Sequence, residues 1–154
     1  MLKKHMKIMS IIIILLLFSC KYHNHNSISE INLIENKIEQ TDYFISLPEN
    51  YNIYLTESTI WIENSEKYII GTISMFNNSP SPVANNFIFI ENTSRRILDI
   101  DREWKIYALS DKFNGFIAEI IIVDERGKFL HFCTTFNDKE EIYKTINILS
   151  TLRK

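Results

Sequence analysis

The chain has 154 residues, with 17 basic and 19 acidic side chains, and its formal net charge is −2. A chain of this length suits one domain that buries a core without disulfide or metal staples. Only three glycines and three prolines occur, and 45% of the residues are hydrophobic, so the composition excludes a disordered chain. Basic side chains do not outnumber acidic ones, which argues against nucleic acid as a partner, because phosphate binding depends on clustered Lys and Arg.

The first twenty residues have the pattern of a targeting segment. Three lysines in the first seven residues give a positive start, an apolar run spans residues 8–18, and Ser19 precedes Cys20. This order is typical of a secretory signal peptide. The apolar run makes roughly 16 Å of helix, which is too short to cross a bilayer core of about 30 Å.

The tetrapeptide Leu17-Phe18-Ser19-Cys20 resembles the lipobox of bacterial lipoprotein precursors. Leu17 and Ser19 match that pattern, and Phe18 is bulkier than the Ala or Ser usual at its position. The resemblance implies that Cys20 becomes the lipidated first residue of the mature chain, with several acyl chains holding it on the membrane. We therefore expect a membrane-anchored lipoprotein of the bacterial cell envelope, facing the periplasm or the exterior. The alternatives are a plain secretory peptide and an uncleaved anchor.

The signal peptide, residues 1–19, contains three lysines and no acidic residue, so the mature chain has a net charge of about −5. Residues 20–27 comprise the lipidated cysteine and a polar segment without periodicity, which is typical of a flexible tether. His23 and His25 in this tether lack a third ligand nearby, so no metal site is expected there. Residues 28–154 then form a single domain, for which we expect no cofactor.

Between the tether and residue 82, the pattern predicts one helix and four strands. Isoleucines at near-helical spacing favour a short helix within residues 27–40, and the β-branched residues leave a strand as the alternative. Strands are expected at residues 42–47, 53–55, 59–63 and 67–75, followed by a surface loop at 77–82. Residues 84–92 favour a helix, although the apolar run from Phe87 to Ile90 leaves a buried strand open.

Three antiparallel strands are predicted next, at residues 104–109, 116–123 and 128–136. The last two are apolar on both faces, which places them in the middle of the sheet and covered on both sides. Gly127 suits the positive-φ position of the turn between them.

Two polar residues interrupt these apolar strands, Glu119 and His131. A four-residue loop would pair Val123 with Lys128, and the two polar side chains would then face opposite sides of the sheet. On that register they form no catalytic pair. Cys133, in the same strand as His131, is expected to be a small buried residue without a disulfide partner.

The chain ends in a helix predicted over residues 139–152, with Asn137 or Asp138 as its cap. Its apolar residues recur at helical spacing and should pack on the sheet: Ile142, Ile146, Leu149 and Leu152. The elements together predict an α+β fold. We expect a single domain with an antiparallel β-sheet of about six to seven strands, on which the C-terminal helix and one or two further helices pack.

The segment Phe44-Ile45-Ser46-Leu47-Pro48 resembles the opening of the PsbP-like α/β fold, whose members often begin with an apolar strand ending in Pro-x-x-Trp. Tyr51 stands here where Trp is usual. The resemblance extends in element order over roughly residues 40–152. It implies a non-catalytic binding or assembly domain, and it carries no site residues across.

The sequence contains none of the motifs that specify common catalytic or metal sites, including HExxH, CxxC, GxSxG and phosphate-binding glycine loops. We therefore expect the protein to be a binding domain for an envelope protein and not an enzyme. An immunity protein that blocks an envelope toxin is one version of this function. The alternative is a small-ligand carrier, and an enzyme of unknown class comes third. Three aromatic residues are the candidate contacts to a ligand or partner: Tyr51, Trp61 and Trp104.

Overall fold

The computed structural model of the chain describes residues 32–82, 87–108 and 115–154. The predicted signal peptide, the predicted lipidation site Cys20 and the predicted tether lie outside the described residues. Leu33–Lys154 form one compact unit.

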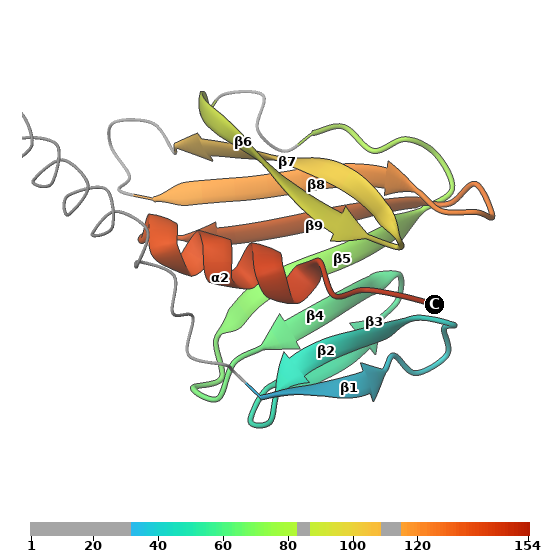
Figure 1. Ribbon diagram of the computed structural model, residues 1–154. Helices are drawn as coiled ribbons and strands as arrows, with labels where there is room; N and C mark the ends of the chain where they lie inside the picture. The colour runs from blue at the N-terminus through green and yellow to red at the C-terminus, as the bar shows by residue number, and fades with distance from the viewer. Residues whose placement is uncertain (1–31, 83–86, 109–114) are drawn as a thin grey trace, which may run out of the picture. The chain divides into compact units, whose positions relative to one another are not determined.

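Nine strands and one helix make up the described part of this unit (Figure 1). The helix is α2 (Lys139–Leu149). In chain order the strands are β1 (Leu33–Lys37), β2 (Phe44–Pro48), β3 (Asn52–Thr56), β4 (Thr59–Glu63), β5 (Ile69–Phe76), β6 (Ile88–Ile97), β7 (Ile100–Ala108), β8 (Phe116–Val123) and β9 (Phe129–Phe136).

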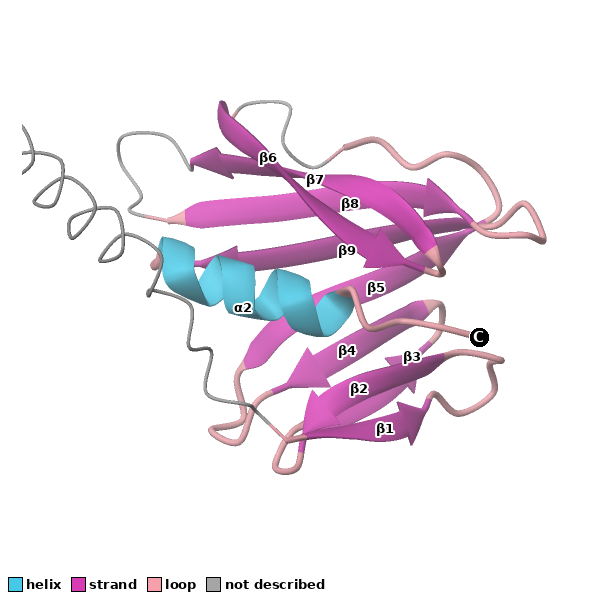
Figure 2. Ribbon diagram, in the orientation of Figure 1, coloured by secondary structure: helices cyan, strands magenta, loops and turns pink. Residues whose placement is uncertain are grey.

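Seven strands form the main sheet in the order β3-β4-β5-β9-β8-β7-β6, and β1 and β2 form a separate antiparallel pair (Figure 2). Every strand pairing in both sheets is antiparallel. The protein therefore has the expected α+β fold, with a seven-stranded antiparallel sheet and a C-terminal helix. As expected, β8 and β9 lie in the middle. No helix of the described ranges is long and apolar enough to span a membrane.

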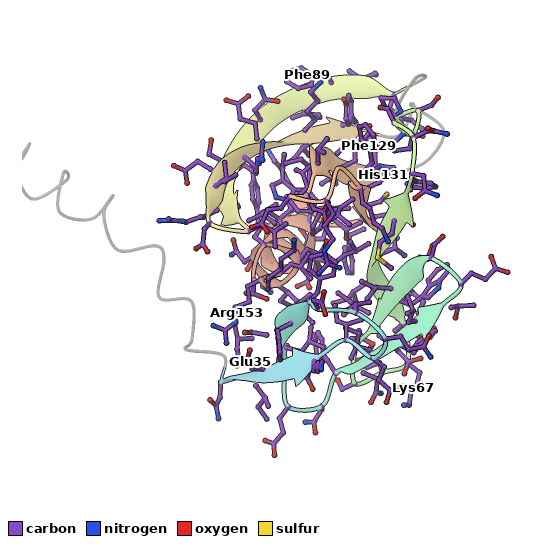
Figure 3. All side chains as sticks on the ribbon, turned by 90° about the vertical axis from the view of Figure 1, so that its right-hand side faces the viewer. Glu35, Lys67, Phe89, Phe129, His131 and Arg153 are labelled. Carbon is purple, nitrogen blue, oxygen red and sulfur yellow. The ribbon has the colours of Figure 1, made fainter. Side chains whose placement is uncertain are left out.

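The core lies on the face of the main sheet that α2 covers, which we call the inner face. Figure 3 shows the sheet curving around the helix. Alternate residues of each strand point inward, as the two-residue period of a strand requires. The core also takes in two residues of β2, Ile45 and Leu47, so the two-stranded sheet shares it. Beside β2 runs the C-terminal segment, where Phe44 and Arg153 exchange backbone hydrogen bonds of 2.8 and 2.9 Å.

Gly71 on β5 allows α2 to approach the sheet closely. A Cβ atom at this position would lie 3.1 Å from Cδ1 of Leu149, closer than an ordinary van der Waals contact. Asp138 caps the helix, because its side chain accepts a hydrogen bond of 2.9 Å from the backbone N–H of Glu140. Three residues of the predicted stripe, Ile142, Ile146 and Leu149, are buried on the helix. The helix ends at Leu149 and not at Leu152 as expected, and Leu152 is buried in the segment that follows it.

The helix expected within residues 27–40 is wrong for residues 33–37, which form β1. Its residues pair with β2, from Leu33 opposite Pro48 to Lys37 opposite Phe44. The strand alternative is the correct one here, because β-branched residues favour extended backbone once a partner strand is available. Residues 27–31 lie outside the described ranges.

The helix expected at residues 84–92 is also wrong where the chain is described. Residues 88–92 belong to β6, which pairs with β7 along its length. A bulge between Phe89 and Glu91 shifts the alternation of side chains by one residue, which brought the apolar spacing close to that of a helix. The fold therefore has one described helix where two or three were expected.

A buried hydrogen-bond network ties the turn between β8 and β9 to the start of β2. The hydroxyl of Tyr43 donates to Oδ2 of Asp124 at 2.6 Å, and Oδ1 accepts from the backbone N–H groups of Arg126 and Lys128 at 2.8 and 2.9 Å. Burial raises the pKa of Asp124, but these hydrogen bonds and the nearby Lys154 outweigh it and hold that pKa below its ordinary value.

We expect the substitution Asp124→Asn to lower the free energy of unfolding by about 1–3 kcal/mol at pH 7, because buried donors lose an acceptor. The folded-state pKa is depressed, so the carboxylate stabilises the fold above its unfolded pKa of about 3.9 and ceases to do so as pH falls through the lower folded value. Urea unfolding should therefore show the gap between wild type and variant closing toward pH 2. The exposed Asp42 offers a control, since Asp42→Asn should change stability little.

Candidate functional site

The turn between β8 and β9 has a three-residue loop, Glu125–Gly127, and not the four-residue loop expected from the sequence. The N–H of Gly127 donates to the carbonyl of Asp124 at 3.0 Å, and the N–H of Asp124 donates to the carbonyl of Lys128 at 2.9 Å. Gly127 has φ +75°, the left-handed position of such a turn. Val123 consequently pairs with Phe129, one residue away from the expected register.

This shift by one residue brings Glu119 and His131 onto the same face. In the observed register Ile121 lies opposite His131 and Cys133 lies opposite Glu119. Nε2 of His131 and Oε2 of Glu119 are 2.9 Å apart, and the two side chains are 8% and 4% exposed. The expectation that they face opposite sides is wrong, because a slip of one residue moves every side chain of a strand to the other face.

Glu119 belongs to a row of side chains that crosses the outer face of the main sheet, the face away from α2, and His131 lies beside this row. Strand registers place one residue of each strand directly opposite the next. From β3 to β7 the row reads Tyr54, Trp61, Thr72, Cys133, Glu119 and Lys105. We call it the outer row. It joins an aromatic end on β3 and β4 to a charged end on β8 and β7.

Cys133 lies within this row without a disulfide. Burial and the neighbouring Glu119 carboxyl raise the pKa of its thiol to about 11. A nucleophilic cysteine needs a lowered pKa, because the thiolate is the reactive form. The expectation of a largely buried, unreactive cysteine is therefore consistent with its surroundings.

A small hollow of about 180 Å³ adjoins the charged end of the outer row. Pro82, Lys105, Tyr107 and Glu119 are among its lining residues. Burial and the nearby Glu119 raise the pKa of Tyr107. A second hollow, of about 110 Å³, lies by the turn between β6 and β7 and is lined by Arg102, Asp124 and Lys154 among others.

The three aromatic residues predicted to contact a ligand do not form one site. Trp104 is fully buried on the inner face, where its Nε1 donates to the hydroxyl of Ser150 at 3.2 Å and its ring packs edge-on against Phe132. Tyr51 packs against the same core from the loop before β3. Trp61 lies on the opposite, outer face, directly across from Tyr54, which is 43% exposed.

The arrangement limits the chemistry available to the described residues. Glu119 and His131 are residue types that perform general acid–base catalysis, but their side chains are almost wholly enclosed, so a substrate has little access to them. No group of three or more His, Cys, Asp or Glu side chains in the described ranges is placed to hold a metal ion. The sequence alone missed Tyr54 and the Glu119–His131 pair, because both depend on strand register.

Scanned against protein-family models, the sequence gives no match, and a search of curated proteins finds no significant relative.

A double-mutant cycle tests the observed register. We expect Glu119→Ala and His131→Ala to be coupled by about 1–3 kcal/mol in the free energy of unfolding, because either substitution removes the buried hydrogen bond that joins the two side chains. Urea denaturation of the wild type, both single variants and the double variant supplies the coupling. A cycle between His131 and Thr145 on α2 serves as the control and should be additive. Additivity of the Glu119–His131 cycle would contradict the register.

Proposed function

We propose that the chain is a lipid-anchored lipoprotein of the bacterial cell envelope whose folded domain binds another envelope protein and catalyses no reaction. The anchor is a set of acyl chains on Cys20, which tethers the domain to the membrane on the periplasmic or exterior side. Immunity against an envelope toxin and a role in assembly are two versions of this function. Nucleic acid is not a partner in this proposal.

The observation that carries the binding proposal is the aromatic end of the outer row. Tyr54 and Trp61 lie directly opposite each other on neighbouring strands, on a face that no described helix covers. Tyr and Trp are enriched in protein interfaces, where they often supply most of the binding energy. Large apolar side chains are also exposed elsewhere on the domain, including Phe76 at 38% and Val123 at 47%.

A protein partner suits this surface better than a small ligand. Pockets for small molecules usually enclose about 300–1,000 Å³, and the two hollows described above hold about 180 and 110 Å³. The raised pKa of Cys133 and the enclosure of His131 support a non-catalytic domain.

The likeness to the PsbP-like fold is part of the same proposal. Its support is the strand Phe44–Pro48 followed by Tyr51, together with a C-terminal helix on an antiparallel sheet. Members of that fold suggest a binding or assembly role, which agrees with the aromatic outer face.

The lipid anchor is tested by replacing Cys20 with Ser. We expect Cys20→Ser to abolish incorporation of labelled palmitate and to release the protein from the membrane, because a hydroxyl at this position does not form the thioether. The mass of the wild-type N-terminus should correspond to cleavage before Cys20 with lipid attached. Urea unfolding of the variant should match the wild type, since Cys20 precedes the compact unit. Wild-type protein without lipid would refute the anchor.

The binding face is tested by photo-crosslinking in cells. A photoreactive phenylalanine in place of Tyr54 should give a discrete protein adduct, and Trp61→Ala should reduce that adduct about tenfold or more, as expected for an interface aromatic. The same probe at Leu33 serves as the control, because this residue is 40% exposed and belongs to the separate β1–β2 sheet. Equal adducts from both positions, or an adduct that is insensitive to Trp61→Ala, would rule out this face.

A further inference from the structure

The far edge of the main sheet offers a second binding element. β6 is the last strand in the sheet order, so its outer backbone edge pairs with no strand of the described chain. It has ten residues, twice as many as β3 at the opposite edge. A long unpaired edge is a template on which another extended chain can add as a strand.

The turn that ends β6 determines which backbone groups face outward. Leu98 and Asp99 have φ values of +49° and +62° and form a two-residue turn between the paired residues Ile97 and Ile100. The residues that flank such a turn direct their N–H and C=O groups toward each other, and the direction alternates along the strand. Outward groups therefore belong to three residues: Asn92, Ser94 and Arg96. In agreement, the carbonyl of Ser94 accepts a 2.7 Å hydrogen bond from the guanidinium of Arg95.

The first half of the same strand is apolar and exposed. Ile88, Phe89 and Ile90 are consecutive, and their exposed fractions are 56%, 54% and 40%. Phe89 stacks edge-on with Tyr107 on β7, at 5.9 Å between ring centroids. The aromatic surface therefore extends from the edge strand β6 to its neighbour β7. A solvated edge normally carries charged residues or proline, and the segment Ile88–Ile90 carries neither.

The second half of β6 is basic. Arg95 lies directly opposite Arg102 of β7, and neither forms an ion pair with a described acidic residue. Directly opposed like charges destabilise a sheet, and a carboxylate placed beside them relieves the repulsion. Arg96 forms only a long, exposed ion pair of 3.8 Å with Asp99. The edge thus complements an acidic segment at this end.

We propose that β6 binds an extended segment of the partner protein as an added antiparallel strand. In that orientation the segment is acidic in its first half, opposite Arg95 and Arg96, and apolar in its second half, opposite Ile88–Ile90. The proposal rests on the proposed protein-binding function and adds a site and a partner chemistry to it. The β6 strand of a second copy does not supply this chemistry, because its one acidic residue, Glu91, is bound to Lys139 at 2.7 Å and to the hydroxyl of Tyr143 on α2.

Selection from a random peptide library on phage, panned against the detergent-solubilised full chain, tests the proposal. Enriched peptides should carry acidic residues followed by alternating apolar residues. Ser94→Pro removes the outward N–H while leaving the ladder to β7 intact, so it should weaken binding of an enriched peptide at least tenfold, measured by fluorescence anisotropy. Ser94→Ala keeps that N–H and should bind within twofold of wild type. Arg96→Glu should weaken binding about tenfold.

Three results would overturn the proposal. One is the enrichment of no acidic–apolar peptide, and another is equal binding to wild type and Ser94→Pro when both unfold at the same urea concentration. The third is a concentration-dependent dimer that Ser94→Pro abolishes, which would assign the edge to a second copy. None of these measurements involves lipid on Cys20 or the aromatic pair on β3 and β4, so failure here is distinguishable from failure of the proposed function.

Discussion

The three-residue turn at Glu125–Gly127 sets which side chains of the two central strands face α2. Gly127 adopts a φ of +75°, a conformation that costs other residues a steric penalty. Because β8 and β9 carry apolar residues on both faces, hydrophobicity alone leaves two registers nearly equivalent. The turn and its hydrogen-bond acceptor Asp124 stabilise the observed register. In this register Phe132 packs against Trp104, and His131 lies beside Glu119.

The packing on the inner face depends on this register. Once Leu130 and Phe132 point inward, α2 packs across β9 and β5, and Gly71 leaves room for Leu149. The chain after α2 then pairs with β2, which holds the β1–β2 pair on the same core. No basic residue occupies the last turn of α2, and Arg95 of β6 instead donates to Asn147 there at 2.6 Å. A cation from a neighbouring strand thus complements the negative end of the helix.

Local sequence signals predicted the parts of the fold that local interactions determine. β4 and the start of α2 lie where alternation and capping predicted them, and β8 lies where its continuous apolar run predicted a central strand. β1 and β6 were predicted as helices because apolar residues recur there at near-helical spacing, and in β6 a bulge interrupts the alternation. Pairing with a partner strand determines whether such a segment becomes helix or strand, and the local sequence does not specify which strand will be the partner. The outer row was not predicted for the same reason, because it joins residues of six strands through their registers.

The two ends of the main sheet offer a partner different chemistry. At β3 and β4 the proposed contact is through the side chains of Tyr54 and Trp61, which project from the outer face of the sheet. At β6 the contact is through backbone groups of Asn92, Ser94 and Arg96, with side chains selecting the sequence. Side-chain contacts of the first kind tolerate rigid partners of complementary shape, whereas strand addition requires an extended segment. A single partner that uses both ends must therefore combine a folded surface with an extended acidic–apolar arm.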